Sequence, residues 1–176
     1  NMQSLKIFIT LCFIAALSNP VNAQQLWSGT VYGMSESTIK TIFPKVIEVK
    51  SNNPDISSVY ELNEVELEGD TFTVRFFFKR EKLIRVVLSS RQIKDMYWIL
   101  QKTNRLEELL TYNYGTSYKS DDKTQRTTHK YKNVHWKNGK TEITLSMYEP
   151  LPDSKIKIEP IAIIYNADFL DAASKL

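Results

Sequence analysis

A two-residue periodicity across residues 65–89 constrains the fold more than any other stretch of the sequence. One face of the first run carries Phe72, Val74, Phe76 and Phe78, the other face carries Thr73, Arg75 and Phe77, and the second run repeats the pattern with Ile84, Val86 and Leu88. Such a period places one set on a buried sheet face and the other towards solvent. Because the intervening residues 79–82 are all charged, the stretch predicts a β-hairpin.

A second hairpin is predicted across residues 131–148, around the dipeptide Asn138-Gly139. Asparagine followed by glycine is strongly preferred at the centre of a type I′ turn, where both residues need positive φ. In that register His135 lies opposite Glu142. The side chains that we expect to face the core are Trp136, Ile143, Leu145 and Met147.

A short helix is predicted between Ser35, a favourable N-cap, and Pro44, which cannot continue a helix. Its apolar face would consist of Ile39, Ile42 and Phe43.

A longer helix is predicted to begin at Ser89 or Ser90, with Gln92 completing a capping box, and to end at Gly115. A phase shift in its pattern predicts either a bend near Thr103-Asn104 or two consecutive helices. The expected apolar stripe is Ile93, Met96, Tyr97 and Leu100, followed by Leu106, Leu109, Leu110 and Tyr114.

Further strands are predicted around Val46 to Val49, over residues 59–67 and from Ile161 to Tyr165, the last with a bulge at Pro160 that indicates a sheet edge. Residues 24–32 are predicted to form a short edge strand anchored by Trp27. Residues 116–130 read as a loop or a hairpin tip. The element order predicts an α+β domain over residues 24–176, in which helices cover one face of an antiparallel sheet of hairpins. A finer interpretation is two tandem helix-plus-strands units, 24–89 and 90–176.

The first 23 residues have the pattern of a secretory signal peptide. Lys6 precedes an apolar run of about a dozen residues, and a small-x-small exit ends at Ala23. The run is shorter than the ~20 residues that a membrane-spanning helix needs. The single cysteine, Cys12, falls inside this segment, so the exported chain would contain none. A disulfide-free exported protein is more typical of a bacterial periplasm than of a small eukaryotic scaffold, so we expect a periplasmic or secreted location.

The composition excludes several classes of function. The net charge is +3, and acidic residues interleave with basic ones, whereas a nucleic-acid binder concentrates its basic residues on one face. The five glycines are scattered, so no phosphate-binding loop is predicted, and thiol catalysis has no cysteine outside the signal. We expect no cofactor.

A family resemblance rests on the opening Tyr32-Gly33-Met34-Ser35, followed by Ile39 and Phe43. This pattern resembles the Gly-Met-Ser start of small bacterial envelope domains, namely the small lipoprotein of the outer-membrane β-barrel assembly machine and β-lactamase-inhibitory-protein-like domains. The resemblance implies helices packed on an antiparallel sheet, sometimes in tandem, and a protein that binds other proteins without catalysing a reaction.

Histidines and acidic residues are the candidates for chemistry. His129 and His135 could bind a metal or transfer protons with nearby acids, but their spacing matches no standard ligand motif. Asp121-Asp122 reads as a solvated loop tip rather than a calcium loop. Glu64, Glu66 and Glu68 read as a solvent-facing strand edge.

Arg75, Phe77 and Tyr148 form the candidate binding surface, because aromatic and arginine side chains are enriched at binding hot spots. Phe77 is the main candidate, unless a second layer of helices covers its face. The sequence therefore predicts an exported, non-enzymatic module that binds a protein or an envelope component. The alternatives are an envelope hydrolase or metal-dependent enzyme using His129 and His135, and a carrier of a small apolar ligand.

Overall fold

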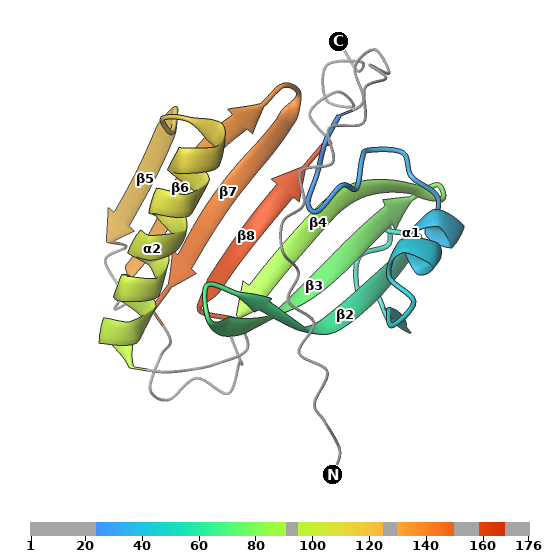
Figure 1. Cartoon of the computed structure of the whole chain (residues 1–176), viewed down its shortest axis with the longest axis horizontal. Coiled ribbons are helices and arrows are strands. Elements are labelled where there is room, and N and C mark those ends of the chain that lie inside the picture. Colours follow the sequence, from blue (N-terminus) through green and yellow to red (C-terminus); the bar gives the residue numbers. More distant parts are fainter. Residues whose placement is uncertain (1–23, 91–94, 125–129, 150–158, 168–176) are drawn as a thin grey trace.

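The computed structural model describes residues 24–90, 95–124, 130–149 and 159–167, which form two helices and one sheet (Figure 1). The helices are α1 (Glu36–Ile42) and α2 (Met96–Tyr114). The strands are β1 (Ile47–Val49), β2 (Ser58–Leu67), β3 (Asp70–Lys79), β4 (Lys82–Ser90), β5 (Lys119–Thr124), β6 (Lys130–Asn138), β7 (Thr141–Tyr148) and β8 (Ile161–Asn166). Every pairing is antiparallel, in the order β1-β2-β3-β4-β8-β7-β6-β5. The predicted α+β class with an antiparallel sheet of hairpins is confirmed.

The sheet consists of two halves that meet at the pair β4–β8. In each half a helix precedes four strands, and the strand order of one half mirrors that of the other. This is the form that two tandem units would give. The division into units 24–89 and 90–176 stays a prediction.

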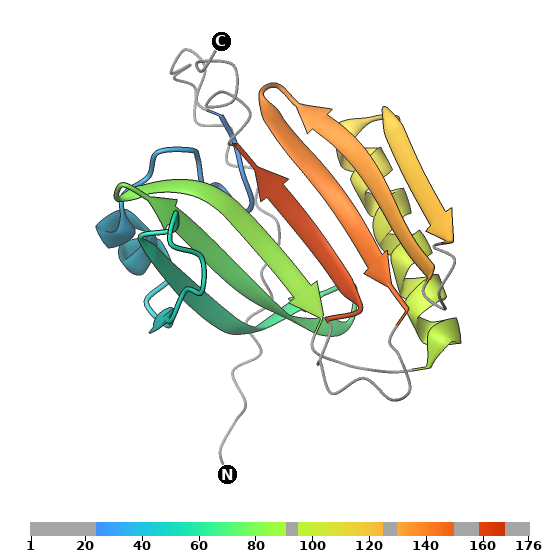
Figure 2. The same ribbon diagram turned by 180° about the vertical axis from the view of Figure 1, so that it is seen from behind.

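Both helices lie on the same side of the sheet (Figures 1 and 2). One row of cross-strand partners on that side consists of Phe76, Val86, Tyr165 and Ile143. Phe43, at the end of α1, contacts Phe76 with ring centroids 5.1 Å apart. Tyr114, at the end of α2, contacts Tyr165 at 6.4 Å. The core therefore lies between the sheet and the two helices.

The core residues of both predicted hairpins are confirmed. Phe72, Val74, Phe76, Phe78, Val86 and Leu88 are at most 1% exposed, as are Trp136, Ile143 and Leu145. Burying one such side chain contributes about 2 kcal/mol relative to leaving it in water. These strands therefore supply most of the hydrophobic stabilisation.

The short helix begins as predicted, because Ser35 Oγ accepts a hydrogen bond from the Thr38 N–H at 3.2 Å. Ile39 is fully buried and Phe43 packs against the core. The prediction for Ile42 was wrong, since this side chain is 44% exposed.

The start of the long helix was predicted wrongly. Ser89 and Ser90 belong to β4, where they pair with Thr73 and Phe72. The N-cap is Asp95, whose carboxylate accepts from the Trp98 N–H at 2.8 Å. Strand pairing outweighed the capping tendency of the two serines, and Gln92 and Ile93 lie outside the described residues.

Of the two alternatives predicted for this segment, two consecutive helices are excluded, because α2 is one helix that is continuous through Thr103. The Thr103 hydroxyl donates to the Ile99 carbonyl at 2.7 Å, which satisfies this polar group inside the helix. Tyr97 and Leu100 are 71% and 44% exposed, and the buried positions are Ile99, Thr103, Leu106 and Leu110. The predicted C-terminal glycine is confirmed, since Gly115 has a φ of 80° and donates to the Thr111 carbonyl.

The register of the second hairpin differs from the prediction by two residues. Asn138 pairs with Thr141, so the two central turn residues are Gly139 and Lys140. Gly139 has a φ of 59°, as the first central position of a type II′ turn requires. His135 is therefore opposite Thr144 rather than Glu142, although each side chain keeps its predicted face.

Three further predictions about segments need correction. Residues 116–130 include an edge strand, β5, paired with β6. Strand β8 lies between β4 and β7, so the inference of an edge near Pro160 was wrong. The segment 24–33, which we call the strap, forms no strand of the sheet and contains one isolated bridge, Gln25 to Val31.

The strap joins the two halves of the molecule. The Gln24 side chain donates to the Lys140 carbonyl at 2.7 Å, and the Thr141 hydroxyl donates to the Gln25 carbonyl at 2.6 Å. At its other end, the Gly33 N–H donates to the Leu83 carbonyl at 2.9 Å. The strap thus runs from the β6–β7 turn to the start of β4.

A second connection joins α2 to the tip of the β2–β3 hairpin. Lys102 forms an ion pair with Asp70 and donates to the Glu68 carbonyl at 2.6 Å. Arg105 forms an ion pair with the Glu68 carboxylate at 3.0 Å. The helix of the second half is therefore fixed to the first half as well as to its own strands.

Candidate functional site

The side of the sheet that neither α1 nor α2 covers is called the helix-free face (Figure 2). Cross-strand pairing defines a row on this face that includes one residue from each of the eight strands. In spatial order the row is Ile47, Glu61, Arg75, Val87, Ile164, Thr144, His135 and Lys119. Two polar networks therefore flank an apolar centre formed by Val87 and Ile164.

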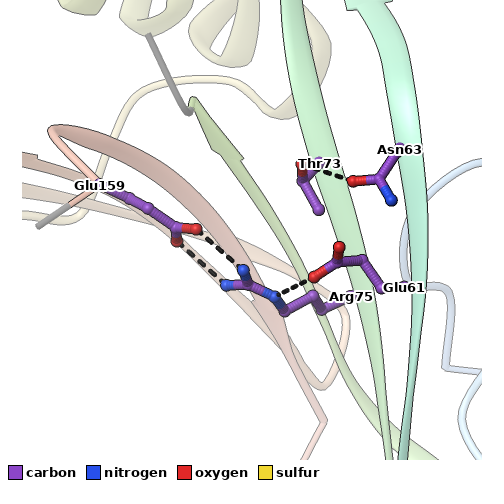
Figure 3. Close-up of polar contacts among 5 residues, drawn as sticks. All are labelled: Glu61, Asn63, Thr73, Arg75 and Glu159. Atoms are coloured by element: carbon purple, nitrogen blue, oxygen red, sulfur yellow. Dashed lines mark hydrogen bonds and ion pairs between the residues drawn. The ribbon is translucent and has the colours of Figure 1, made fainter. Parts of the chain in front are cut away.

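The first network is centred on Arg75 (Figure 3). Its Nε donates to Glu61 on β2 at 2.9 Å, and its two terminal nitrogens donate to the two carboxylate oxygens of Glu159 at 3.1 and 3.0 Å. The Glu61 side chain is 8% exposed, whereas those of Arg75 and Glu159 are 27% and 29% exposed. Burial would lower the pKa of Arg75, but the hydrogen bonds to Glu159 and Glu61 outweigh it and raise this pKa.

This network crosses the boundary between the halves. Glu61 and Arg75 belong to the first half, whereas Glu159 precedes β8 of the second half. Beside them, the Thr73 hydroxyl donates to the Asn63 side chain at 3.2 Å (Figure 3). Arg75 thus lies on the predicted face, but its guanidinium is already bound to two carboxylates.

Phe77 lies on the helix-free face, one row from Arg75, between Val59 and Arg85. It is partly exposed, and the two described helices lie on the opposite side of the sheet. Tyr148 is on the same face and 41% exposed, but it lies three strands away on β7, where it stacks on Tyr131. Three strand spacings are about 14 Å. The structure therefore brings together Arg75 and Phe77 but not Tyr148.

The second network is centred on His135 of β6. Its Nδ1 lies 3.1 Å from Glu142 Oε1 and 3.1 Å from Thr144 Oγ1. Its Nε2 lies 3.8 Å from Asp121 Oδ2, beyond hydrogen-bonding distance. A ring nitrogen carries either one proton or one lone pair, so Glu142 and Thr144 compete for Nδ1. His129 lies outside the described residues.

Tyr118 closes this network. Its hydroxyl donates to Glu142 Oε1 at 2.7 Å, and the Lys137 ammonium lies 4.8 Å from the centre of its ring. Desolvation of the phenol, together with the bond to Glu142, raises the pKa of Tyr118 to about 12. Lys119 forms an ion pair with Asp121 at 2.7 Å. Asp121 is therefore a paired strand residue rather than part of a solvated loop tip.

The geometry of the His135 network does not match a metal centre. Within the described ranges, no group of three or more histidine, cysteine or acidic side chains is arranged to hold a metal ion. Glu64, Glu66 and Glu68 are exposed on or beside β2, as predicted, and Glu68 binds Arg105 of α2.

Sequence reasoning missed Glu61, Arg85, Glu159 and Tyr118 as members of this face. Charge complementarity could have identified Glu61, because it is the direct cross-strand partner of Arg75. Glu159 has no such signal, since its pairing with Arg75 spans 84 residues.

Comparison with known proteins gives no assignment. No protein family, curated protein or solved structure matches the chain. In the described part of the chain, neither helix is long and apolar enough to cross a membrane. The resemblance to small envelope domains stays a prediction, and the functional argument rests on the geometry of the helix-free face.

Proposed function

We propose that the protein is an exported, non-enzymatic binding module whose helix-free face docks another protein or an envelope component. The observation that carries this proposal is the row of residues that crosses all eight strands of the helix-free face. In this row the Arg75 network and the His135 network lie on opposite sides of an apolar centre. The location that we propose, periplasmic or secreted, rests on the pattern of the first 23 residues.

The face is suited to binding because its polar groups are held in place before a partner arrives. The Arg75 network joins β2 and β3 to the chain preceding β8. The His135 network joins β6 to β7, and the hydrogen bond from Tyr118 to Glu142 adds the residue that precedes β5. Between them Val87, Ile164 and Phe77 are partly exposed. Preorganised groups lose little conformational entropy on association, which favours binding.

Site-specific photocrosslinking tests this proposal. A benzophenone amino acid at Phe77 should crosslink a distinct species in an envelope extract, whereas the same group at Tyr112 should not. Tyr112 is 88% exposed on α2 and serves as the matched control on the other side of the molecule. Equal adducts from both positions, or adducts from Tyr112 alone, would contradict the proposal. Arg75 is unsuitable for this purpose, because its replacement would also alter stability.

One observation favours part of the second candidate, a hydrolase that uses His135. His135 lies between two carboxylates, Asp121 and Glu142, and contacts the Thr144 hydroxyl. A panel of ester, peptide and glycoside substrates, tested with wild type and His135→Ala, separates the two candidates. Turnover that the substitution abolishes would favour the enzyme. The third prediction, an apolar-ligand carrier, gains no specific support from the buried side chains between helices and sheet.

A further inference from the structure

We propose that Arg85, in the middle of the helix-free face, binds a carboxylate supplied by a partner protein, next to an apolar side chain of that partner. This inference rests on the proposed function and adds the chemistry of the partner. It is carried by the charge pairing of the face and by the side chains around Arg85.

The other charged groups in the two cross-strand rows that contain Arg75 and Arg85 have partners among the described residues. Arg75 is bound to Glu61 and Glu159, and Lys119 is bound to Asp121. Glu142 accepts from Tyr118 and contacts His135, and Lys137 lies over the Tyr118 ring. Among the described residues, Arg85 has no carboxylate partner. Arg85 is therefore a positive charge on this face that no described carboxylate compensates.

Arg85 is partly exposed on β4, the fourth of the eight strands in spatial order. Its Nε donates to the Asn166 side chain over a long 3.4 Å, and no described residue binds its terminal nitrogens. Asn166 and Phe77 are its cross-strand neighbours on the two sides. The planar end of Arg85 can therefore receive both oxygens of one carboxylate.

The surroundings determine which partner fits. Phe77, Val87 and Ile164 supply apolar surface beside Arg85, so an apolar residue next to the acidic one would be buried on binding. Arg75 and Lys119, two other cations of this face, are already paired with carboxylates, so the described residues offer no continuous basic patch for a polyanion such as a nucleic acid or an anionic lipid surface. A single carboxylate on a protein chain satisfies Arg85 without needing such a patch.

A displayed library of random dodecapeptides provides the probe. Protein produced from the full chain is panned against the library, and the most enriched peptide is synthesised and titrated by fluorescence anisotropy. We expect an enriched peptide with Asp or Glu beside an apolar residue. Arg85→Gln should weaken its binding by about tenfold or more, as expected for an arginine hot spot. Arg85→Lys should lie in between, because lysine keeps the charge but loses the bidentate geometry.

Lys82→Gln is the matched control, since it removes the same charge from the same strand at the exposed turn and should leave binding unchanged. Thermal denaturation verifies that each variant is folded. If Phe77→Lys abolishes binding but Arg85→Gln does not, the proposed carboxylate contact of Arg85 is refuted, whereas the proposed docking function of the helix-free face is supported. If neither substitution matters, or no peptide is enriched, both proposals fail. If light scattering shows self-association that Arg85→Gln abolishes, the occupant is a second copy, and the inference of a separate partner is wrong.

Discussion

Replacing Arg75 with methionine should destabilise the protein more than a substitution on a sheet surface usually does. The substitution keeps a long unbranched side chain but removes the guanidinium from Glu61 and Glu159. Glu61 then keeps a negative charge that is 8% exposed and has lost this cation. Removing Arg75 from beside this buried carboxylate costs more than the net contribution of the ion pair itself.

The expected magnitude lies between two limits. Breaking a fully buried pair costs about 3–5 kcal/mol, whereas exposed pairs are worth about 0–1 kcal/mol. Glu61 is close to the buried limit, while Arg75 and Glu159 retain 27% and 29% exposure. We therefore expect Arg75→Met to lower the free energy of unfolding by about 2 kcal/mol. Adding Glu61→Met should recover about half of this loss, because no charge is then left buried.

Urea denaturation measures this effect as a shift in midpoint at constant slope. Arg105→Met is the control, since Arg105 also contacts two carboxylates, at 3.0 and 3.2 Å, but is 61% exposed. It should leave the urea midpoint nearly unchanged, because exposed ion pairs contribute little to stability. Equal losses for the two arginine variants would refute the argument from burial. A double variant less stable than Arg75→Met would refute the argument from the buried Glu61 carboxylate.

Three other predictions concern the turn and two titrating groups. The central residues of the β3–β4 turn, Arg80 and Glu81, have φ values of 50° and 63°, so replacing them with Asn-Gly should stabilise the protein by about 1 kcal/mol in urea denaturation. A hydrogen bond from Ser58, with a second from Tyr60, lowers the pKa of Glu36 from 4.5. Its contribution to stability is therefore present above pH 4.5 and lost as the pH falls through the folded-state pKa, so the stability difference between wild type and Glu36→Gln should shrink in acid. The pKa of Tyr118 is raised to about 12. The protonated phenol therefore contributes to folding stability below pH 10, and this contribution is lost as the pH approaches 12. Glu142→Gln should lower this pKa, which absorbance at 295 nm can follow against Tyr118→Phe.

The fold was predictable where short-range pattern and burial agree. Alternation alone identified the buried faces of β3, β4 and β7, because a strand with one face in the core leaves little freedom in side-chain direction. The turn of the second hairpin was not predictable to the residue, since Asn-Gly fits the centre of one turn type and Gly-Lys fits another. The prediction of where α2 begins was wrong for a related reason. Ser89 and Ser90 are good caps, but pairing with β3 competes for the same residues.

The candidate site was predictable only in part. Arg75 and Phe77 were placed on the correct face by their position in the alternation. The cluster around His135 depends on the register of the β6–β7 hairpin and on β5, for which the sequence offered a loop or a hairpin tip. The pairing of Arg75 with Glu159 depends on β4 and β8 being neighbours, which no local pattern indicates.

The strap has a consequence for the order in which the chain can fold. Gln24 and Gln25 find their partners in Lys140 and Thr141, each 116 positions away. Closing such a distant contact costs chain entropy before it returns any stabilisation, so this part of the molecule is expected to dock late. During synthesis the strap has no partner at the β6–β7 turn until residue 141 has been made. Until then this end of the strap stays undocked in the nascent chain, and the two halves of the sheet can pair their strands before it closes across them.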